Sequence, residues 1–249
     1  MSEERKDTGI KDTIKDYIIT FVYAFVVFLI VRAFTFELFI IPSGSMKPML
    51  IEGDIIAVSK YEYGYSRYSL PLGINLIKDR IFDYHKPERG DVIVFKLPSN
   101  PKIFYIKRLI GLPNDRVQMR NGDLYINDKL ISKEYKNDYT DEKYNLLLSR
   151  YEETLEDVNR KYDILREKNF ISEANNTKEF IIPAGHYFFM GDNRDNSLDS
   201  RFEATGFVPY NHIVGEAKMI LFSKKQSVIL SLLQFKNPFR FDRFFTKIN

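Results

Sequence analysis

The stretch "IIPSGSMKPML", residues 40–50, decides how this chain is interpreted. Proline fixes φ and glycine admits tight backbone geometry, so "PSGSM" is expected to form a rigid, exposed loop that presents Ser45. Such a loop suits a nucleophile whose own backbone amide is free to donate a hydrogen bond. A plain Pro/Ser/Gly turn fits the same five residues. A partner base elsewhere in the chain is needed to decide between the two.

Composition limits the protein to a few classes. The 249 residues fit one sizeable domain with an appendage. The formal net charge is only +3, and because acidic and basic residues are interspersed, no nucleic-acid partner is expected. The chain has no cysteine, which excludes a disulfide framework and a thiolate nucleophile but leaves the redox compartment open.

An uncharged run, "YIITFVYAFVVFLIV", occupies residues 17–31. Continued as a helix to residue 36, it would be roughly 30 Å long, which matches the hydrocarbon thickness of a bilayer. We therefore predict a transmembrane anchor over residues 17–36. A buried globular helix and a cleaved signal peptide are the alternatives, but apolar residues lie on every face and no small-x-small cleavage site follows.

The basic residues near this run are distributed unevenly. Four precede it, at Arg5, Lys6, Lys11 and Lys15, whereas Arg32 and Lys47 are the nearest on its other side. The positive-inside rule then predicts that residues 1–16 are cytoplasmic and that residues 37–249 lie on the opposite side of the membrane.

Beyond the anchor the pattern is mainly that of strands. Short β-branched or aromatic segments are bounded by Gly, Pro or Asn: "GDIIAVSK", "GDVIVFKLP", "IFYIKRLIGLP", "EFIIPAGHYFFMGDN" and "HIVGEAKMILF". In "VQMRNGDLYIND" the Asn121-Gly122 pair predicts a hairpin turn. Residues 134–178 are charged and ambiguous, because they fit either an amphipathic helix or an irregular hairpin that turns at "EDVN".

A lysine is the better candidate for the base. The three histidines follow no defensible Ser-His-Asp order, and a structural role is expected for each. A neutral amine is a competent base when burial lowers its pKa. In "FYIKRLIGLP", strand alternation places Lys107 on one face with Tyr105 and Leu109, beside apolar neighbours. A lysine that reaches solvent from an edge strand is the alternative.

A third polar cluster is "GDNRDNSLDSR", residues 191–201. As a calcium loop starting at Asp192 it would have Arg194 at position three and Ser197, not glycine, at position six, so the EF-hand pattern fails. We predict no metal site. Acids and arginines that alternate this densely favour a network of Asp–Arg pairs that clamps a site.

In order and spacing, "PSGSMKPML", "GDVIVF", "YIKRLIGLPNDRV" and "GDNRDNSLDSR" resemble the successive boxes of the type I bacterial signal peptidases, or leader peptidases. These boxes frame residues 38–222 of this chain. The resemblance implies a mainly β fold of the signal-peptidase/LexA-like kind with one N-terminal transmembrane helix. It also implies that residues 114–180 form a less regular β extension inserted between the catalytic boxes of a domain spanning residues 37–249.

The resemblance also assigns roles. Ser45 would be the nucleophile and Lys107 the general base of a Ser-Lys dyad, while the Ser43 hydroxyl and the Ser45 amide would form an oxyanion hole. Ser197 would orient the lysine amine. The residues that would hold the framework of the site are Asp192, Arg194, Asp199 and Arg201. The residues that would line shallow apolar pockets for the substrate are Ile41, Pro42, Met46, Leu50, Tyr105 and Ile106. Met49 replaces the usual threonine, and "RFEATGFVP" departs from the family pattern after the last box.

The implied function is that of a membrane-bound serine endopeptidase that removes signal peptides from secreted precursors after an Ala-x-Ala motif, without metal or cofactor. Its partners would be those precursors and the lipid bilayer. It would sit in the bacterial cytoplasmic (inner) membrane with its catalytic domain on the periplasmic side. An inactive, membrane-tethered peptide-binding module and a self-cleaving regulator of the related Ser-Lys repressor fold are the alternatives.

The C-terminal stretch "FKNPFRFDRFFTKIN", residues 235–249, interleaves phenylalanines with lysines and arginines. Such a pattern suits a second membrane contact, in which rings enter the acyl boundary and cations meet anionic lipid. Simple packing of the phenylalanines on the domain is the alternative.

Overall fold

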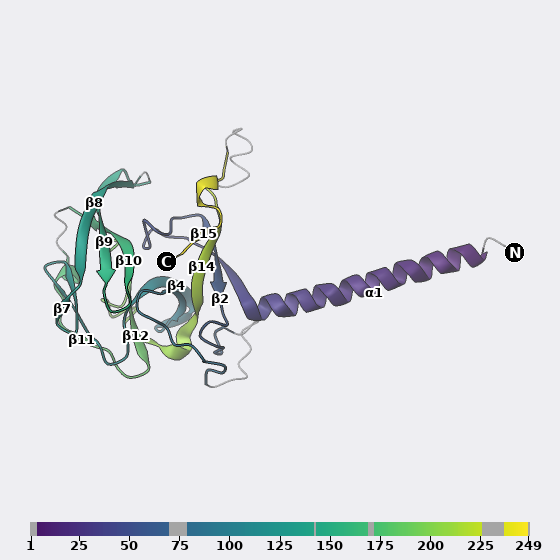
Figure 1. Ribbon diagram of the computed structural model, residues 1–249, viewed down its shortest axis with the longest axis horizontal. Coiled ribbons are helices and arrows are strands. Elements are labelled where there is room, and N and C mark those ends of the chain that lie inside the picture. The colour runs from purple at the N-terminus through teal and green to yellow at the C-terminus, as the bar shows by residue number, and fades with distance from the viewer. Residues whose placement is uncertain (1–3, 70–78, 142, 169–171, 226–236, 249) are drawn as a thin grey trace.

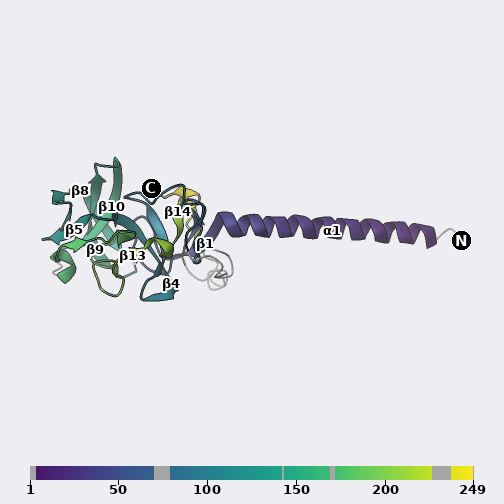
Figure 2. The ribbon, with the colours of Figure 1, turned by 90° about the horizontal axis from the view of Figure 1, so that it is seen from below.

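The computed structural model describes residues 4–69, 79–141, 143–168, 172–225 and 237–248. Helix α1 (Glu4–Thr35) extends away from a β domain as a long rod in both views (Figures 1 and 2). Its apolar side chains are exposed, Tyr17 by 73% and Phe21 by 70%. Within the described residues, no helix combines the length and the apolar character needed to cross a membrane.

The helix differs in two details from the predicted anchor. It begins at Glu4, well before residue 17, and it ends at Thr35, because Phe36 is already the first residue of strand β1. The side chains of Arg5, Lys6, Lys11 and Arg32, on which the predicted orientation partly depends, lie outside the described residues.

The main element of the domain is an eight-stranded antiparallel sheet. Its strand order is β1-β2-β14-β3-β4-β12-β13, and β15 also pairs with β14. The strands are β1 (Phe36–Ile40), β2 (Asp54–Ser59), β3 (Val92–Leu97), β4 (Asn100–Gly111), β12 (His186–Met190), β13 (Val208–Pro209), β14 (Ile213–Ser223) and β15 (Thr246–Lys247). Each of the five predicted strand segments contributes to this sheet, which confirms the mainly β class.

A second, four-stranded sheet contains the predicted hairpin. Its order is β11-β5-β6-β7, formed by β11 (Phe180–Ile181), β5 (Arg116–Arg120), β6 (Asp123–Ile126) and β7 (Lys129–Leu130). Asn121 and Gly122 have φ values of 51° and 79°, as a two-residue turn with two left-handed positions requires. The hairpin prediction is confirmed.

The ambiguous segment forms a third sheet, not a helix. Strands β8 (Ser132–Asp141), β9 (Leu146–Leu155) and β10 (Arg160–Glu167) pair in the order β10-β9-β8. The β9–β10 turn lies at residues 156–159, the "EDVN" that was proposed for it. β9 and β10 pair over eight consecutive positions without a register shift, whereas the β8–β9 pairing shifts register between Tyr135 and Asn137.

The catalytic loop predicted from the sequence lies between β1 and β2 and rests on the main sheet. Ile41, Met46 and Leu50 are buried in one apolar cluster with residues of β2, β3 and β14. The remaining short elements are the 3-10 helices η2 (Glu173–Asn175), η3 (Tyr210–His212) and η4 (Phe241–Arg243). Burial of the loop's apolar residues holds it against the sheet.

Candidate active site

Ser45 lies on a tight turn that its neighbours anchor. The amide of Lys47 donates to the carbonyl of Gly44 at 3.1 Å, and the amide of Leu50 donates to that of Met46 at 2.9 Å. Met46 and Leu50 are fully buried, Ser45 is 8% exposed and Ser43 is exposed. The sequence therefore folds locally into a turn with a buried apolar base and a polar upper side.

Lys107 reaches this turn from the interior of the main sheet. Strand β4 lies between β3 and β12, so Lys107 is not on an edge strand, and its side chain is 4% exposed. Its Nζ donates a 2.7 Å hydrogen bond to Ser45 Oγ and a 2.9 Å bond to the carbonyl of Ile106. The structure thus brings together the two predicted catalytic residues, which are 62 positions apart in the chain.

The surroundings of Lys107 adjust its basicity. Burial lowers its pKa from 10.5 to about 8, although the nearby carboxylates of Asp199 and Asp192 oppose the shift and Arg201 adds to it. A pKa near 8 leaves an appreciable neutral fraction at physiological pH, and only the neutral amine can accept a proton. The 2.7 Å contact and the lowered pKa are what a serine nucleophile with a lysine base requires.

Ser43 also faces the nucleophile. Its Oγ lies 3.5 Å from Ser45 Oγ. An oxyanion donor has to lie near the carbonyl that the nucleophile attacks, and a hydroxyl on the same turn meets that requirement.

The predicted role of Ser197 in orienting Lys107 stays a prediction. The Ser197 hydroxyl is buried beside the carboxylate of Asp199, whose pKa it helps to lower, and the two hydrogen bonds of Lys107 Nζ within the described residues go to Ser45 and Ile106. Ser197 is nevertheless close to the dyad, since a Cβ added to Gly191 would lie 2.2 Å from Ser197 Oγ and 2.6 Å from the carbonyl of Ser45. Only glycine fits at position 191, between the last box and the nucleophile.

Two of the predicted framework residues, Asp199 and Arg201, form a buried pair. The Arg201 guanidinium donates twice to the Asp199 carboxylate, at 2.9 Å each, and also to the carbonyl of Arg194 at 2.6 Å. Asp199 further accepts the amide of Gly191 at 3.0 Å. Burial alone would raise the pKa of Asp199, but these donors hold it below its usual value. Asp199 is therefore an anion close to Lys107.

The other two framework residues, Asp192 and Arg194, pair with partners that the sequence analysis missed. Asp192 accepts two hydrogen bonds of 2.8 Å from Arg108, and the guanidinium of Arg194 forms a buried two-bond pair with Glu153. Arg108 follows Lys107 and points to the opposite side of β4, as strand alternation requires. Glu153 lies on β9, within the segment whose structure was ambiguous, so no sequence signal indicated it.

Asn193 is a further site residue that the sequence analysis did not single out. Its amide donates to the carbonyl of Ser45 at 3.0 Å, and its side-chain Nδ2 donates to the carbonyl of Gly44 at 3.1 Å. These bonds fix the backbone on both sides of Ser45. Its place between Asp192 and Arg194, in a box that carries charged site residues, was the available signal.

The predicted pocket residues do not share one environment. Ile41, Met46 and Leu50 belong to a buried cluster against which Ile106 is partly packed. Tyr105 packs on a different cluster that contains Phe95, and Pro42 is exposed. The fully buried members can contribute at most the floor of a binding surface, whereas Pro42, Tyr105 and Ile106 keep exposed atoms.

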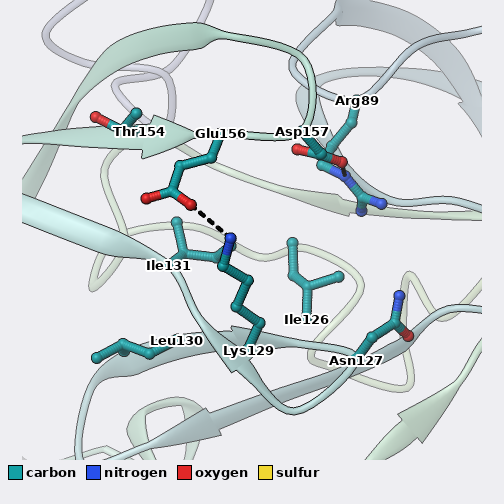
Figure 3. A pocket seen from close by; sticks show the side chains of 9 residues that line it. All are labelled: Arg89, Ile126, Asn127, Lys129, Leu130, Ile131, Thr154, Glu156 and Asp157. Atoms are coloured by element: carbon teal, nitrogen blue, oxygen red, sulfur yellow. Dashed lines mark hydrogen bonds and ion pairs between the residues drawn. The ribbon is translucent and has the colours of Figure 1, made fainter.

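A cavity of about 270 Å³ lies elsewhere, between the four-stranded sheet and the β9–β10 turn (Figure 3). It is lined by Arg89, Ile126, Asn127, Lys129, Leu130, Ile131, Thr154, Glu156 and Asp157. Arg89 pairs with Asp157 and Lys129 pairs with Glu156 there. None of these residues is a predicted site residue.

Comparison with known proteins points in one direction. The family model described as "Signal peptidase, peptidase S26" matches residues 14–222. A signal peptidase I of Rickettsia typhi is 40% identical over 227 residues, covering 89% of this chain and 85% of that protein. One from Rickettsia bellii is 39% identical over 245 residues, covering 92% and 84%. A solved signal peptidase I from Enterococcus faecalis V583 is 33% identical and covers 53% of this chain and 97% of its own, with a TM-score of 0.32.

Proposed function

This chain belongs to the signal peptidase family, peptidase S26, and we propose that it cleaves signal peptides with Ser45 as its nucleophile and Lys107 as its general base. It is a serine endopeptidase that removes signal peptides, and secreted precursor proteins are its substrates. The 2.7 Å contact between Lys107 Nζ and Ser45 Oγ carries the assignment of the dyad. The cleavage position, after small residues of an Ala-x-Ala motif, is part of the proposal.

In the proposed reaction, neutral Lys107 takes the hydroxyl proton of Ser45 as Oγ attacks the carbonyl carbon of the scissile peptide bond. The resulting ammonium then gives that proton to the departing amine, and the bond between carbonyl carbon and nitrogen breaks. An acyl ester on Ser45 remains. Water attacks this ester, Lys107 takes the water proton, and the proton returns to Ser45 Oγ as the signal peptide leaves with a free carboxylate.

The remaining polar groups support this chemistry without forming covalent bonds or transferring protons. The Ser43 hydroxyl and the Ser45 amide are proposed to donate to the oxyanion that forms on the attacked carbonyl. Ser197 is proposed to orient the Lys107 amine, which requires its hydroxyl to turn from the Asp199 carboxylate towards Nζ when substrate is bound. The pair of Arg108 with Asp192 holds the last box against β4, and the pair of Arg201 with Asp199 fixes the conformation of the box itself.

We further propose that the apolar part of α1, residues 17–35, anchors the protein in the cytoplasmic membrane with residues 1–16 in the cytoplasm. The support is the uncharged run of residues 17–31 and the exposure of its side chains in the structure. The domain would then lie on the periplasmic side. Because Ser45 follows the helix end by ten residues, the nucleophile would stay near the membrane plane, where a precursor's cleavage site emerges.

The decisive experiment incubates detergent-solubilised full-length protein with a precursor that carries an Ala-x-Ala site. Ser45→Ala and Lys107→Arg should each abolish cleavage while retaining the thermal unfolding transition, because arginine stays charged and cannot act as a base. A folded Lys107→Arg variant with near-normal turnover would refute the dyad. Binding without cleavage by the natural chain would instead favour a peptide-binding module.

A further inference from the structure

The hairpin formed by β8 and β9 touches the catalytic loop at a buried lysine that the proposed reaction does not use. Lys47 lies two residues after the nucleophile, and its side chain is 5% exposed. Its Nζ donates to Asp141 Oδ2 at 2.8 Å and lies 2.9 Å from Glu52 Oε2. A lysine is seldom buried unless it is paired, and here two carboxylates hold its ammonium.

The stem of Lys47 covers the turn that carries the nucleophile. A Cβ built on Gly44 would lie 2.9 Å from Lys47 Cε and 3.1 Å from its Cδ, so the side chain folds back onto the residue between Ser43 and Ser45. The amide of Lys47 also donates to the carbonyl of Gly44. The position of this side chain and the shape of the turn are therefore linked through Gly44.

The residues that hold Lys47 come mainly from the tip of the β8–β9 hairpin. Asp141 is the last residue of β8, 94 positions away in the chain, and its Oδ1 accepts the amide of Lys143 at 3.1 Å. Lys143 Nζ in turn donates to Glu52 at 3.1 Å, and the Tyr144 ring lies 5.6 Å from Lys47 Nζ. The hairpin tip thus contacts the loop that carries Ser45 through Lys47 and Glu52.

We propose that Lys47, held by Asp141 and Glu52, is a positioning residue through which the β8–β9 hairpin sets the geometry of Ser43 and Ser45. The inference rests on the proposed function only in requiring that Ser45 is the nucleophile. Replacing Lys47 by methionine keeps an unbranched stem over Gly44 but removes the ammonium and releases the hairpin. The turn then relaxes, and a small misplacement of reacting groups costs up to about 100-fold in rate.

The test compares kcat and KM of full-length Lys47→Met, Asp141→Asn and the natural protein on the same precursor. Both variants should lower kcat about tenfold or more while KM stays within about twofold. Asp141→Asn removes the same ion pair from the side of the hairpin. It replaces Lys47→Met as the test variant if Lys47→Met does not fold. Lys129→Met is the matched control, because its pair with Glu156 is exposed and lines the cavity that contains no predicted site residue. It should leave kcat unchanged.

A second comparison separates positioning from general stabilisation. Ser43→Ala is made in the natural, Lys47→Met and Asp141→Asn backgrounds, and kcat is corrected for the folded fraction. If Lys47 positions the turn, Ser43→Ala lowers kcat by a smaller factor in either variant background than in the natural protein. The reason is that the Ser43 hydroxyl is already misplaced in those backgrounds. Equal factors in all backgrounds, or a normal kcat in both folded variants, would overturn the inference. Normal cleavage by Ser45→Ala would instead overturn the proposed function.

Discussion

Lys107 illustrates, at the scale of one residue, how a proposed catalytic role opposes stability. Burial that lowers its pKa to about 8 also makes the charged form unfavourable in the folded protein. Between about pH 8 and 10.5 the unfolded chain binds more protons than the folded one, so stability rises with pH across that window. Below about pH 8 the lysine is charged in both the folded and the unfolded chain, so the folded state bears the full free-energy cost of burying its charge.

We therefore expect Lys107→Met to be inactive but more stable than the natural chain. At pH 7 its free energy of unfolding should be higher by up to about 3 kcal/mol, which is the depressed pKa converted to energy. The difference should shrink between pH 8 and 10.5, because there the natural lysine loses its charge. Chemical denaturation at pH 7 and pH 10.5 measures it, and a less stable variant at pH 7 would show that methionine packs poorly at this position.

The same pKa predicts how activity depends on pH. With chemistry rate-limiting, kcat should rise with pH through a limb near pH 8, because only the neutral amine accepts the serine proton. Cleavage rates measured from pH 6 to 10 on one precursor check this. A flat profile would contradict the role of Lys107, whereas Lys129→Met, an exposed lysine variant, should keep the limb in place.

Ser43 should affect the transition state and not the binding of substrate. Its hydroxyl lies 3.5 Å from Ser45 Oγ, and the oxyanion that it would contact exists only after attack. Ser43→Ala should lower kcat by about 100-fold or more and leave KM nearly unchanged. Steady-state kinetics measure kcat and KM separately. A rise in KM at constant kcat would show that Ser43 binds substrate instead.

At the scale of elements, the three-stranded sheet supports the site from two directions. Its β8–β9 tip holds Lys47 through Asp141, and β9 holds Arg194 through Glu153. The backbone of Leu165 on β10 donates to the carbonyl of Asp192 and accepts the amide of Arg194. Although no predicted catalytic residue lies on this sheet, the last catalytic box is built against it.

Glu153→Gln should therefore be strongly destabilising. Arg194 and Glu153 are almost fully buried, so removing the carboxylate charge leaves a buried guanidinium without its counter-ion, at a cost of about 3–5 kcal/mol. Glu156→Gln is the matched control, because this residue lies three positions further on, in the exposed β9–β10 turn, and should leave Tm nearly unchanged. Equal Tm values for the two variants would refute the structural role of the Arg194–Glu153 pair.

At the scale of the whole molecule, the C-terminal tail packs on the domain, while its contact with lipid stays a prediction. Phe235 and Lys236 lie outside the described residues. Of the rest, Arg243 binds the carboxylate of Asp54, β15 pairs with β14, and Ile248 is buried in the core. Phe241 and Phe245, by contrast, are 60% and 62% exposed. The tail is therefore part of the domain, yet it presents aromatic rings to the outside.

Two changes to the tail should separate its packing on the domain from the predicted contact of its rings with lipid. In a fragment that begins at Phe36 and melts cooperatively, deleting residues 237–249 should lower Tm, because β15, Ile248 and the Arg243–Asp54 pair are lost. Phe241→Ala with Phe245→Ala should keep Tm but weaken binding to anionic vesicles, if the rings contact lipid. Ile181→Ala, another exposed apolar residue, is the control. Unchanged vesicle binding in the double variant would show that these two rings do not contribute to membrane binding.

Much of the molecule follows from the sequence, because the signals concerned are local. Strand segments with period-two patterns, the Asn121-Gly122 turn and the loop with Ser45 depend on backbone preferences of adjacent residues. The pairing of Ser45 with Lys107 was predicted through the order of the four boxes, and the structure brings the two atoms to 2.7 Å. The charged positions of residues 134–178 are compatible with both a helix and a strand pattern, and only the family resemblance favoured a β extension there.

Only the tertiary structure decided which buried charges are partners. The sequence placed Asp192, Arg194, Asp199 and Arg201 in one network, but Asp192 pairs with Arg108 and Arg194 pairs with Glu153. A charge can be paired with any opposite charge that the fold brings near, so spacing along the chain does not specify the partner. The same is true of Lys47, whose partner Asp141 comes from a hairpin that the sequence left undetermined. Local residue types determined the strands, turns and reactive groups, whereas the packing of distant strands determined their contacts and the pKa of Lys107.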